Sequence, residues 1–145
     1  MINFEHSIDI DKPADVVFAF LANPANETQW QAGLLESKLT TDGQVEVGAT
    51  GRDTRKFMGR EVITIWEVTD FEPNKMFGFK VIAGPVPFRG AYTFVPTTTG
   101  TRVTITAQAQ MNGLSRLFEP IIAYSGKQQY EKDFLTLKKV LEAPN

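Results

Sequence analysis

The side chains that could carry out chemistry are few in this sequence. It has 145 residues, no cysteine and a single histidine, His6. This composition excludes thiol nucleophiles, zinc-thiolate sites and iron-sulfur clusters, and any Ser-His-Asp mechanism would have to use His6. The other candidates for a positioned acid or base are Tyr92 and the pair Asp53 and Arg55, which lie two residues apart.

Length, charge and motifs narrow the function further. A chain of 145 residues predicts one domain over residues 1–145. With 15 basic against 17 acidic residues, the net charge of -2 gives no reason to expect nucleic acid or an anionic membrane as the main partner. The sequence has no P-loop, no Gly-rich dinucleotide turn and no zinc ligand set, so we expect no cofactor and no metal. It has neither a signal-peptide pattern nor 18 consecutive apolar residues, which predicts a cytoplasmic protein without stable membrane insertion.

Alternation and turn signals place these residues on an α+β framework. Residues 2–10 alternate between apolar and polar, which predicts a half-buried strand. Asp11-Lys12-Pro13 starts a helix, with Pro13 in its first turn, and a second short helix is expected from Asn23-Pro24 to Trp30. The segment from Leu34 to Met111 predicts five or six antiparallel strands. After Asn112-Gly113 a helical pattern continues for about 30 residues, so the sheet should carry helices on one face.

The turn at Met58-Gly59 allows the register of one hairpin to be derived. If Phe57 pairs with Arg60 across this turn, Gly51 faces Trp66, and directly paired residues share a face. One face then holds Ala49, Gly51, Asp53, Arg55, Thr64, Trp66 and Val68. We take this face as inward, which points Asp53 and Arg55 toward the interior, although a one-residue bulge would reverse the assignment.

The C-terminal helical segment carries two different apolar faces. One is a continuous stripe of Tyr130, Phe134, Leu137 and Leu141. Extended backward at helical spacing, this stripe reaches the small or polar residues Gly126, Ala123 and Glu119. Together with Gly51 and Ala49 they predict a hollow, because a packed core would need large side chains at these positions. The second face could contact loops, a lipid surface or the partner of a homodimer, and consists of Leu114, Leu117, Phe118 and Ile121.

Seven short motifs, in this order, resemble the START-like (SRPBCC) superfamily, in its polyketide cyclase/dehydrase and lipid transport branch. The motifs are Ile10-Asp11-Lys12-Pro13-Ala14-Asp15-Val16-Val17-Phe18, Pro24 to Trp30, Val47-Gly48-Ala49, Phe57-Met58-Gly59-Arg60, Val68-Thr69-Asp70-Phe71-Glu72-Pro73, Tyr92-Thr93-Phe94 and Gly100-Thr101-Arg102-Val103-Thr104. The resemblance covers essentially the whole chain. It implies a helix-grip fold, in which a curved, roughly seven-stranded antiparallel sheet wraps around a long C-terminal helix and encloses an apolar cavity. Two short helices would lie between the first and second strands.

We expect such a cavity to have walls of mostly aromatic residues and a few polar side chains. The wall candidates are Trp30, Trp66, Phe77, Phe79, Tyr92, Phe94, Ala123 and Tyr130, and the polar candidates are His6, Asp53, Arg55 and Glu119. Each has a structural alternative. The aromatic residues could be plain core, and His6 could be a hydrogen-bonded core residue. Asp53 and Arg55 could simply pair with each other, and Glu119 could stabilise a helix N-terminus.

Two functions follow from this set. The first is binding of a small hydrophobic or amphipathic ligand, such as a lipid, a polyketide-like molecule or an aromatic molecule, by a carrier or sensor. The second is a cyclase or dehydratase that acts on a polyketide-like or aromatic substrate in the same cavity. The enzyme would need an acid or base from His6, Asp53 with Arg55, or Tyr92.

Overall fold

The chain forms the predicted sequence of helices and strands. The computed structural model describes residues 2–109 and 113–144, and of Ser115 only the backbone. The elements are β1 (Ile2–Ile10), α1 (Ala14–Leu21), the 3-10 helix η1 (Pro24–Gln29), β2 (Leu34–Leu39), β3 (Thr50–Phe57), β4 (Arg60–Glu72), β5 (Met76–Ala83), β6 (Phe88–Pro96), β7 (Thr101–Ala109), the 3-10 helix η2 (Gly113–Phe118) and α2 (Glu119–Glu142). Met111, the predicted end of the strand region, and Asn112, predicted to precede the last helix, lie outside the described residues.

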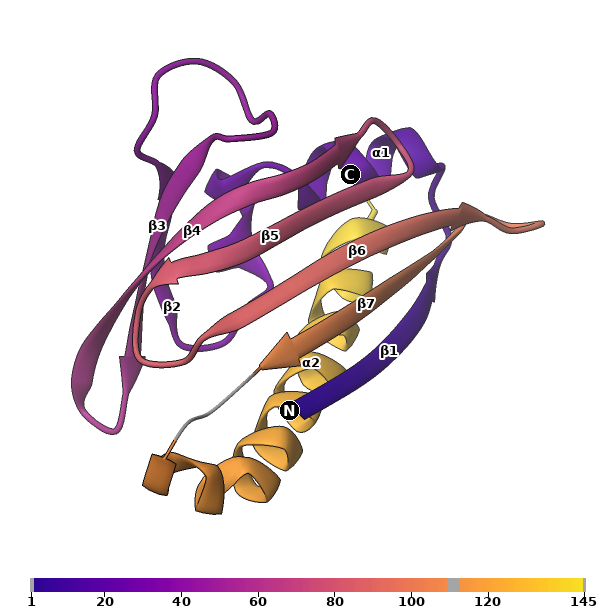
Figure 1. The fold of residues 1–145 in the computed structure, drawn as a ribbon. Coiled ribbons are helices and arrows are strands. Elements are labelled where there is room, and N and C mark those ends of the chain that lie inside the picture. The colour runs from indigo at the N-terminus through magenta and orange to yellow at the C-terminus, as the bar shows by residue number, and fades with distance from the viewer. Residues whose placement is uncertain (1, 110–112, 145) are drawn as a thin grey trace.

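The described strands make one antiparallel sheet in the order β1-β7-β6-β5-β4-β3-β2. Figure 1 shows this sheet curving around α2, with α1 and η1 closing one side between β1 and β2. The α+β helix-grip architecture is thereby confirmed, including the two short helices before the second strand. Pro13 differs from the prediction, because it is the N-cap residue of α1 and has an extended backbone (ψ 153°).

The hairpin of β3 and β4 has the derived register. Phe57 pairs with Arg60, and Gly51 pairs with Trp66. The turn between them requires left-handed backbone at both Met58 (φ 52°) and Gly59 (φ 80°). That conformation matches the twist of the strands in a two-residue hairpin, which explains why the turn fixes the register. Asp53 and Trp66 consequently lie on the inward face.

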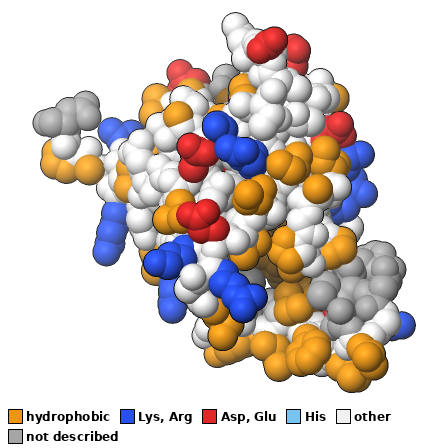
Figure 2. Space-filling model, turned by 90° about the vertical axis from the view of Figure 1, so that its left-hand side faces the viewer, with side chains coloured by type: hydrophobic (Ala, Val, Ile, Leu, Met, Phe, Trp, Pro, Cys, Tyr) orange, Lys and Arg blue, Asp and Glu red, His pale blue; other side chains and the backbone are white. Residues whose placement is uncertain are grey.

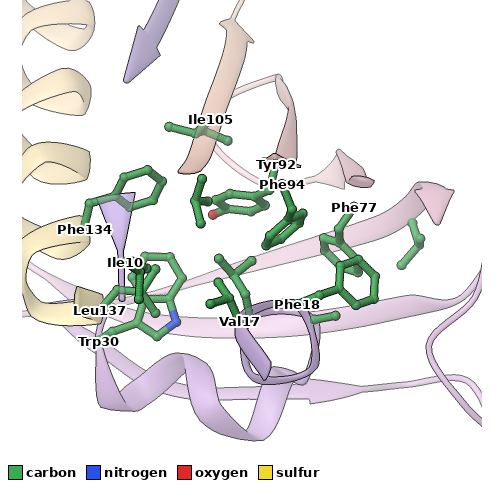
Figure 3. Packing of buried hydrophobic residues seen from close by; sticks show 14 of the residues in the cluster. Ile10, Val17, Phe18, Trp30, Phe77, Tyr92, Phe94, Ile105, Phe134 and Leu137 are labelled. Atoms are coloured by element: carbon green, nitrogen blue, oxygen red, sulfur yellow. The ribbon is translucent and has the colours of Figure 1, made fainter. Parts of the chain in front are cut away.

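The fully buried core lies between the C-terminal half of α2 and the strands and helix that face it. Phe134 and Leu137 of α2 are fully buried, as is Trp30 at the end of η1. In Figure 3 these side chains point toward Ile10 and Val17, with Tyr92 between them and the aromatic group of Phe18, Phe77 and Phe94. The bulky half of the helical stripe therefore fills its space, as its residue sizes predicted.

The small residues of the predicted hollow have different roles. A Cβ atom added at Gly51 would lie 2.1 Å from Cζ2 of Trp66, so the indole ring occupies the space beside this glycine. Ala49 is buried in the core. Gly126 alone of the predicted small residues borders the cavity, since Ala123 is half-buried outside its lining. The expectation that Gly51 and Ala49 leave a hollow was wrong, because sequence spacing does not show which neighbour fills the space.

Candidate functional site

A cavity of about 950 Å³ lies between the sheet, the first half of α2 and η1. Its side chains come from β3, β4, β5 and β6, from η1 and the residues after it, and from α2. They are Ala22, Pro24, Glu27, Gln31, Ala32, Gly33, Asp53, Arg55, Lys56, Phe57, Val62, Thr64, Trp66, Phe77, Phe79, Val81, Pro85, Val86, Phe88, Tyr92, Ile121, Ile122, Ser125, Gly126, Gln129 and Tyr130. This volume is in the range of pockets that enclose small organic molecules.

Aromatic rings form the wall that β5 and β6 supply. The Phe79 ring lies 5.6 Å from the Phe88 ring and 6.0 Å from the Tyr92 ring, centre to centre. These are ordinary separations for tilted aromatic pairs, which prefer offset or edge contacts. Behind this wall, the ring centre of Phe4 of β1 lies 5.4 Å from that of Tyr130 of α2. An apolar or aromatic ligand would therefore meet rings over much of its surface.

One side of the cavity is polar and is organised around Asp53. Oδ1 of Asp53 accepts hydrogen bonds from Ser37 Oγ at 2.6 Å and from Trp66 Nε1 at 2.9 Å. The other carboxylate oxygen lies 4.0 Å from Nη2 of Arg55. Asp53 is thus held by a fixed donor pair, and its charge lies opposite the Arg55 guanidinium.

Arg55 connects this carboxylate to a second acid, Glu27. The Arg55 guanidinium donates to the amide oxygen of Gln31, and the Gln31 amide nitrogen donates to Oε2 of Glu27. Glu27 belongs to η1, and Gln31 lies four residues later, so both side chains project to the same side. We call Glu27, Gln31, Asp53 and Arg55 the polar cluster.

Burial changes the ionisation of the acids that face the cavity. Burial, reinforced by the negative charge of Asp53, raises the pKa of Glu27 to about 8, against the opposing effects of Arg55 and Gln31. Burial likewise raises the pKa of Tyr130 to about 12 and the pKa of Tyr92 well above its ordinary value. At neutral pH Glu27 is therefore mostly a neutral acid, and both phenols are neutral.

The Asp133 carboxylate ties the polar cluster to α2. It is buried and accepts hydrogen bonds from the backbone N–H of Ala32 at 3.1 Å and from Nε2 of Gln129 at 2.9 Å. Burial raises the pKa of Asp133, and these two hydrogen bonds and the Arg55 charge oppose that effect. Because Ala32 follows Gln31 directly, α2 helps to fix the position of Gln31 over the cavity.

Six of the predicted ligand-binding residues line the cavity together. They are Asp53, Arg55, Trp66, Phe79, Tyr92 and Tyr130, and the further wall candidate Phe77 also lines the cavity. Their contact with a ligand stays a prediction. Asp53 and Arg55 face the cavity and also pair with each other, so both interpretations of this pair apply to the same geometry.

The other predicted residues lie outside the cavity lining. Trp30 and Phe94 are buried in the core, where Phe94 contacts the Phe18 ring at 5.1 Å. His6 lies beneath the helix, with its ring centre 5.5 Å from that of Phe134. Glu119 and Ala123 are also absent from the lining. The periodicity of strands and helices predicted their inward faces correctly. Residues on one inward face can nevertheless belong either to the packed core or to the cavity lining, depending on their position along the strand or helix.

The sequence analysis missed Glu27 and Gln31. Both lie in or just after a segment that was predicted only as a short helix, from Asn23-Pro24 to Trp30. The available signal was their spacing of four residues, which lets a Glu and a Gln interact on one helical face. Among the described residues, no group of three or more His, Asp or Glu side chains is arranged to hold a metal ion. In the same part of the chain, no helix is long and apolar enough to cross a membrane.

Several solved structures share this fold. A protein of Thermus thermophilus is 16% identical over 97% of both chains, with a TM-score of 0.81. The di-domain ARO/CYC StfQ of the steffimycin biosynthetic pathway is 14% identical, with a TM-score of 0.82, and covers 97% of this chain and 51% of its own. The Zhui aromatase/cyclase of a Streptomyces species is 14% identical, with a TM-score of 0.77, over 97% of this chain and 93% of its own.

At these identities the likeness extends to the fold alone. No curated protein matches the sequence. The family is shown by the sequence itself, because the model of one family matches residues 1–142, nearly the whole chain. With its curved sheet, its long C-terminal helix and a cavity between them, the chain belongs to the polyketide cyclase / dehydrase and lipid transport family.

Proposed function

We propose that this protein binds a small hydrophobic or amphipathic molecule in the cavity, as a carrier or sensor. The observation that carries the proposal is the open cavity of about 950 Å³, which has aromatic walls and a polar cluster on one side. Burial of apolar ligand surface supplies roughly 25 cal/mol per Å², so roughly 500 Å² of such surface supplies about 12 kcal/mol. After an association cost of about 4 kcal/mol this leaves about micromolar affinity.

The polar cluster would give the ligand its orientation. Arg55 and neutral Glu27 are hydrogen-bond donors, while Asp53 is already occupied by Ser37 and Trp66. A ligand with an apolar body and a carbonyl, hydroxyl or carboxyl group at one end fits this division. The aromatic wall would take the body and the cluster would take the polar end.

Binding can be tested with N-phenyl-1-naphthylamine, a neutral apolar dye that fluoresces when it leaves water. We expect saturable binding by the wild-type chain and a loss of affinity of about tenfold or more in Gly126→Leu, because the new side chain extends into the cavity. Gly126→Ala is the matched control, since its Cβ would lie 3.8 Å from the Phe4 ring, an ordinary contact. Equal dye affinity in both variants, or no saturable binding by wild type, would refute the proposal.

A cyclase or dehydratase is the second candidate, and Glu27 is the observation that favours it. A neutral carboxylic acid beside a guanidinium can donate a proton or a hydrogen bond to a substrate carbonyl, which stabilises the negative charge that develops on its oxygen. Two structures of similar fold carry names that include aromatase/cyclase or ARO/CYC. In an assay with a poly-β-ketone, Glu27→Gln should lower kcat by about 100-fold or more while dye affinity is retained. An unchanged kcat would exclude Glu27 as the acid.

A further inference from the structure

Three exposed apolar segments surround the opening of the cavity. We define the cavity rim as residues 56–61 of the β3–β4 hairpin, residues 84–88 between β5 and β6, and residues 113–127 of η2 and α2. Each segment contributes to the cavity lining, through Phe57, Val86 and Ile121 among others. In Figure 1 the ends of both hairpins and η2 lie at the same end of the molecule, at the lower left. The apolar side chains of the rim therefore border a single opening.

The exposure of the rim is large for apolar side chains. Met58 is 87% exposed, Leu114 83% and Leu117 75%, and Phe57, Phe118 and Ile121 are each more than half exposed. Figure 2 shows hydrophobic side chains gathered along the lower edge of the molecule, with Lys and Arg side chains beside them. Single exposed apolar residues are common, but a cluster of this kind marks an interaction surface.

The rim also differs in charge from the rest of the chain. It carries the basic residues Lys56, Arg60, Arg116 and Lys127 against the acidic residues Glu61 and Glu119, a net charge of +2. Because the whole chain has a net charge of -2, the remaining residues carry -4. The balanced total, which gave no reason to expect an anionic membrane, conceals this asymmetry.

We propose that the cavity rim docks on the surface of an anionic lipid membrane. Exposed apolar side chains would enter the boundary between headgroups and acyl chains, and the basic side chains would contact the anionic headgroups. Docking in this orientation places the cavity opening against the bilayer, so an apolar ligand can pass between them without crossing water. The transfer step rests on the proposed function, whereas the docking step does not.

The charge of the rim favours a membrane over a second copy of the chain. A two-fold dimer through the rim would bring the same basic side chains of both copies together, and like charges across an interface are unfavourable. An anionic membrane instead complements them. The apolar side chains are also divided among three segments around an opening, which suits insertion at several points into a soft surface.

Sedimentation with lipid vesicles tests the docking. Vesicles of phosphatidylcholine with about 30% phosphatidylglycerol should bind the wild-type chain, and pure phosphatidylcholine vesicles should bind it more weakly. The double variant Lys56→Glu with Arg60→Glu should lose about 25-fold or more in affinity for the anionic vesicles, because each basic residue near such a surface contributes about 1 kcal/mol, or fivefold. The double variants Phe57→Ser with Met58→Ser and Leu114→Ser with Leu117→Ser should each lose about tenfold on both vesicles.

Leu135→Ser is the matched control for the apolar variants. Leu135 is also exposed on α2 but lies 14 residues beyond Ile121, about 21 Å along the helix, so vesicle binding should not change. Equal vesicle binding by the rim variants and wild type, or no binding by wild type, would overturn the proposal. So would a wild-type dimer that Leu114→Ser with Leu117→Ser converts to monomer, because the rim would then be a self-contact. Dye binding by Leu114→Ser with Leu117→Ser, which leaves the cavity lining unchanged, reports separately on the cavity and on folding.

Discussion

At the level of single residues, the ionisation of Glu27 has the largest consequence for the site. An ordinary glutamate is charged at neutral pH, but burial raises the pKa of Glu27 to about 8 in the folded chain. Neutral Glu27 can accept one hydrogen bond from Gln31 and still donate its own proton to a ligand. Above pH 8 the donor is lost, and a second negative charge appears beside Asp53. Affinity for a ligand with a carbonyl group at its polar end should therefore fall as the pH rises through 8.

The same raised pKa makes Glu27 destabilising at neutral and alkaline pH. Between about pH 4.5 and pH 8 the folded chain binds a proton at Glu27 that the unfolded chain has released, so its contribution to stability falls as pH rises through this window. Glu27→Gln removes this dependence. The difference in unfolding free energy between variant and wild type should shift in favour of the variant by about 4 kcal/mol from about pH 5 to pH 9.

Urea unfolding at a series of pH values measures this difference. The titrations of all other groups are common to both proteins, so they cancel in the comparison. Glu46→Gln, at an exposed loop residue, is the control for the loss of one carboxyl group elsewhere in the chain. A difference for Glu27→Gln that does not change with pH would contradict the raised pKa of Glu27.

At the level of elements, the pairing of β3 with β4 determines how the polar cluster is held. Gly51 leaves the space that the Trp66 ring occupies, and this position allows the indole N–H to donate to Asp53. Gly51→Ala places a Cβ 2.1 Å from the ring, so Trp66 must move and its hydrogen bond to Asp53 must break. Overpacking of this kind costs about 1 to 3 kcal/mol.

Chemical denaturation and tryptophan fluorescence together check the Gly51→Ala prediction. We expect a lower unfolding free energy and an emission spectrum shifted by the altered environment of Trp66. Gly126→Ala is the contrast, because its Cβ meets an ordinary contact at 3.8 Å and the substitution improves helix propensity by about 1 kcal/mol. If both variants had wild-type stability and emission, Gly51 would not be needed to seat the indole ring.

The same hairpin shows how far the sequence determines the site. Its register followed from one turn, because left-handed backbone at Met58 and Gly59 permits only one pairing of the flanking strands. The amino-acid sequence was therefore enough to place Asp53 and Trp66 on one face of the hairpin, while the choice of this face as the inward one was an assumption that the structure bears out. Glu27 and Gln31 could not be found in this way, because η1 is a single short 3-10 helix with no repeating apolar face. Their contact with Arg55 depends on how η1 sits against the sheet, which is a tertiary property.

The sequence also could not show which of the inward aromatic residues belong to the core and which line the cavity. Trp30 and Tyr92 were equally good aromatic candidates, yet Trp30 is covered on all sides while Tyr92 has its ring at the cavity. Their ring centres are 6.4 Å apart, so the core residue and the cavity residue are direct neighbours. Alternation along a strand specifies which face a residue lies on, but not whether its side chain packs in the core or borders the cavity.

For the whole molecule, the cavity and the core belong to one cooperative unit, so occupancy of the cavity should change global stability. Tyr92 and Phe134 belong to one packed cluster, and Tyr130 joins the wall to the same helix. A ligand that binds only the folded state at about 100 times its Kd adds about 2.7 kcal/mol to the unfolding free energy. For a domain of 145 residues this corresponds to a rise in Tm of roughly 5 to 10 °C.

Calorimetry with and without N-phenyl-1-naphthylamine measures this linkage. The wild-type Tm should rise with the logarithm of dye concentration once the dye exceeds its Kd, while the Tm of Gly126→Leu should rise less at the same dye concentration because its affinity is lower. The Gly51→Ala variant separates the two parts of the site. The rings of Phe79, Phe88 and Tyr92 stay in place although Trp66 moves, so the dye should still raise its Tm, whereas a ligand that depends on the polar cluster should raise it less. A dye-independent Tm in the wild-type chain would mean that the cavity does not bind the dye in the folded state.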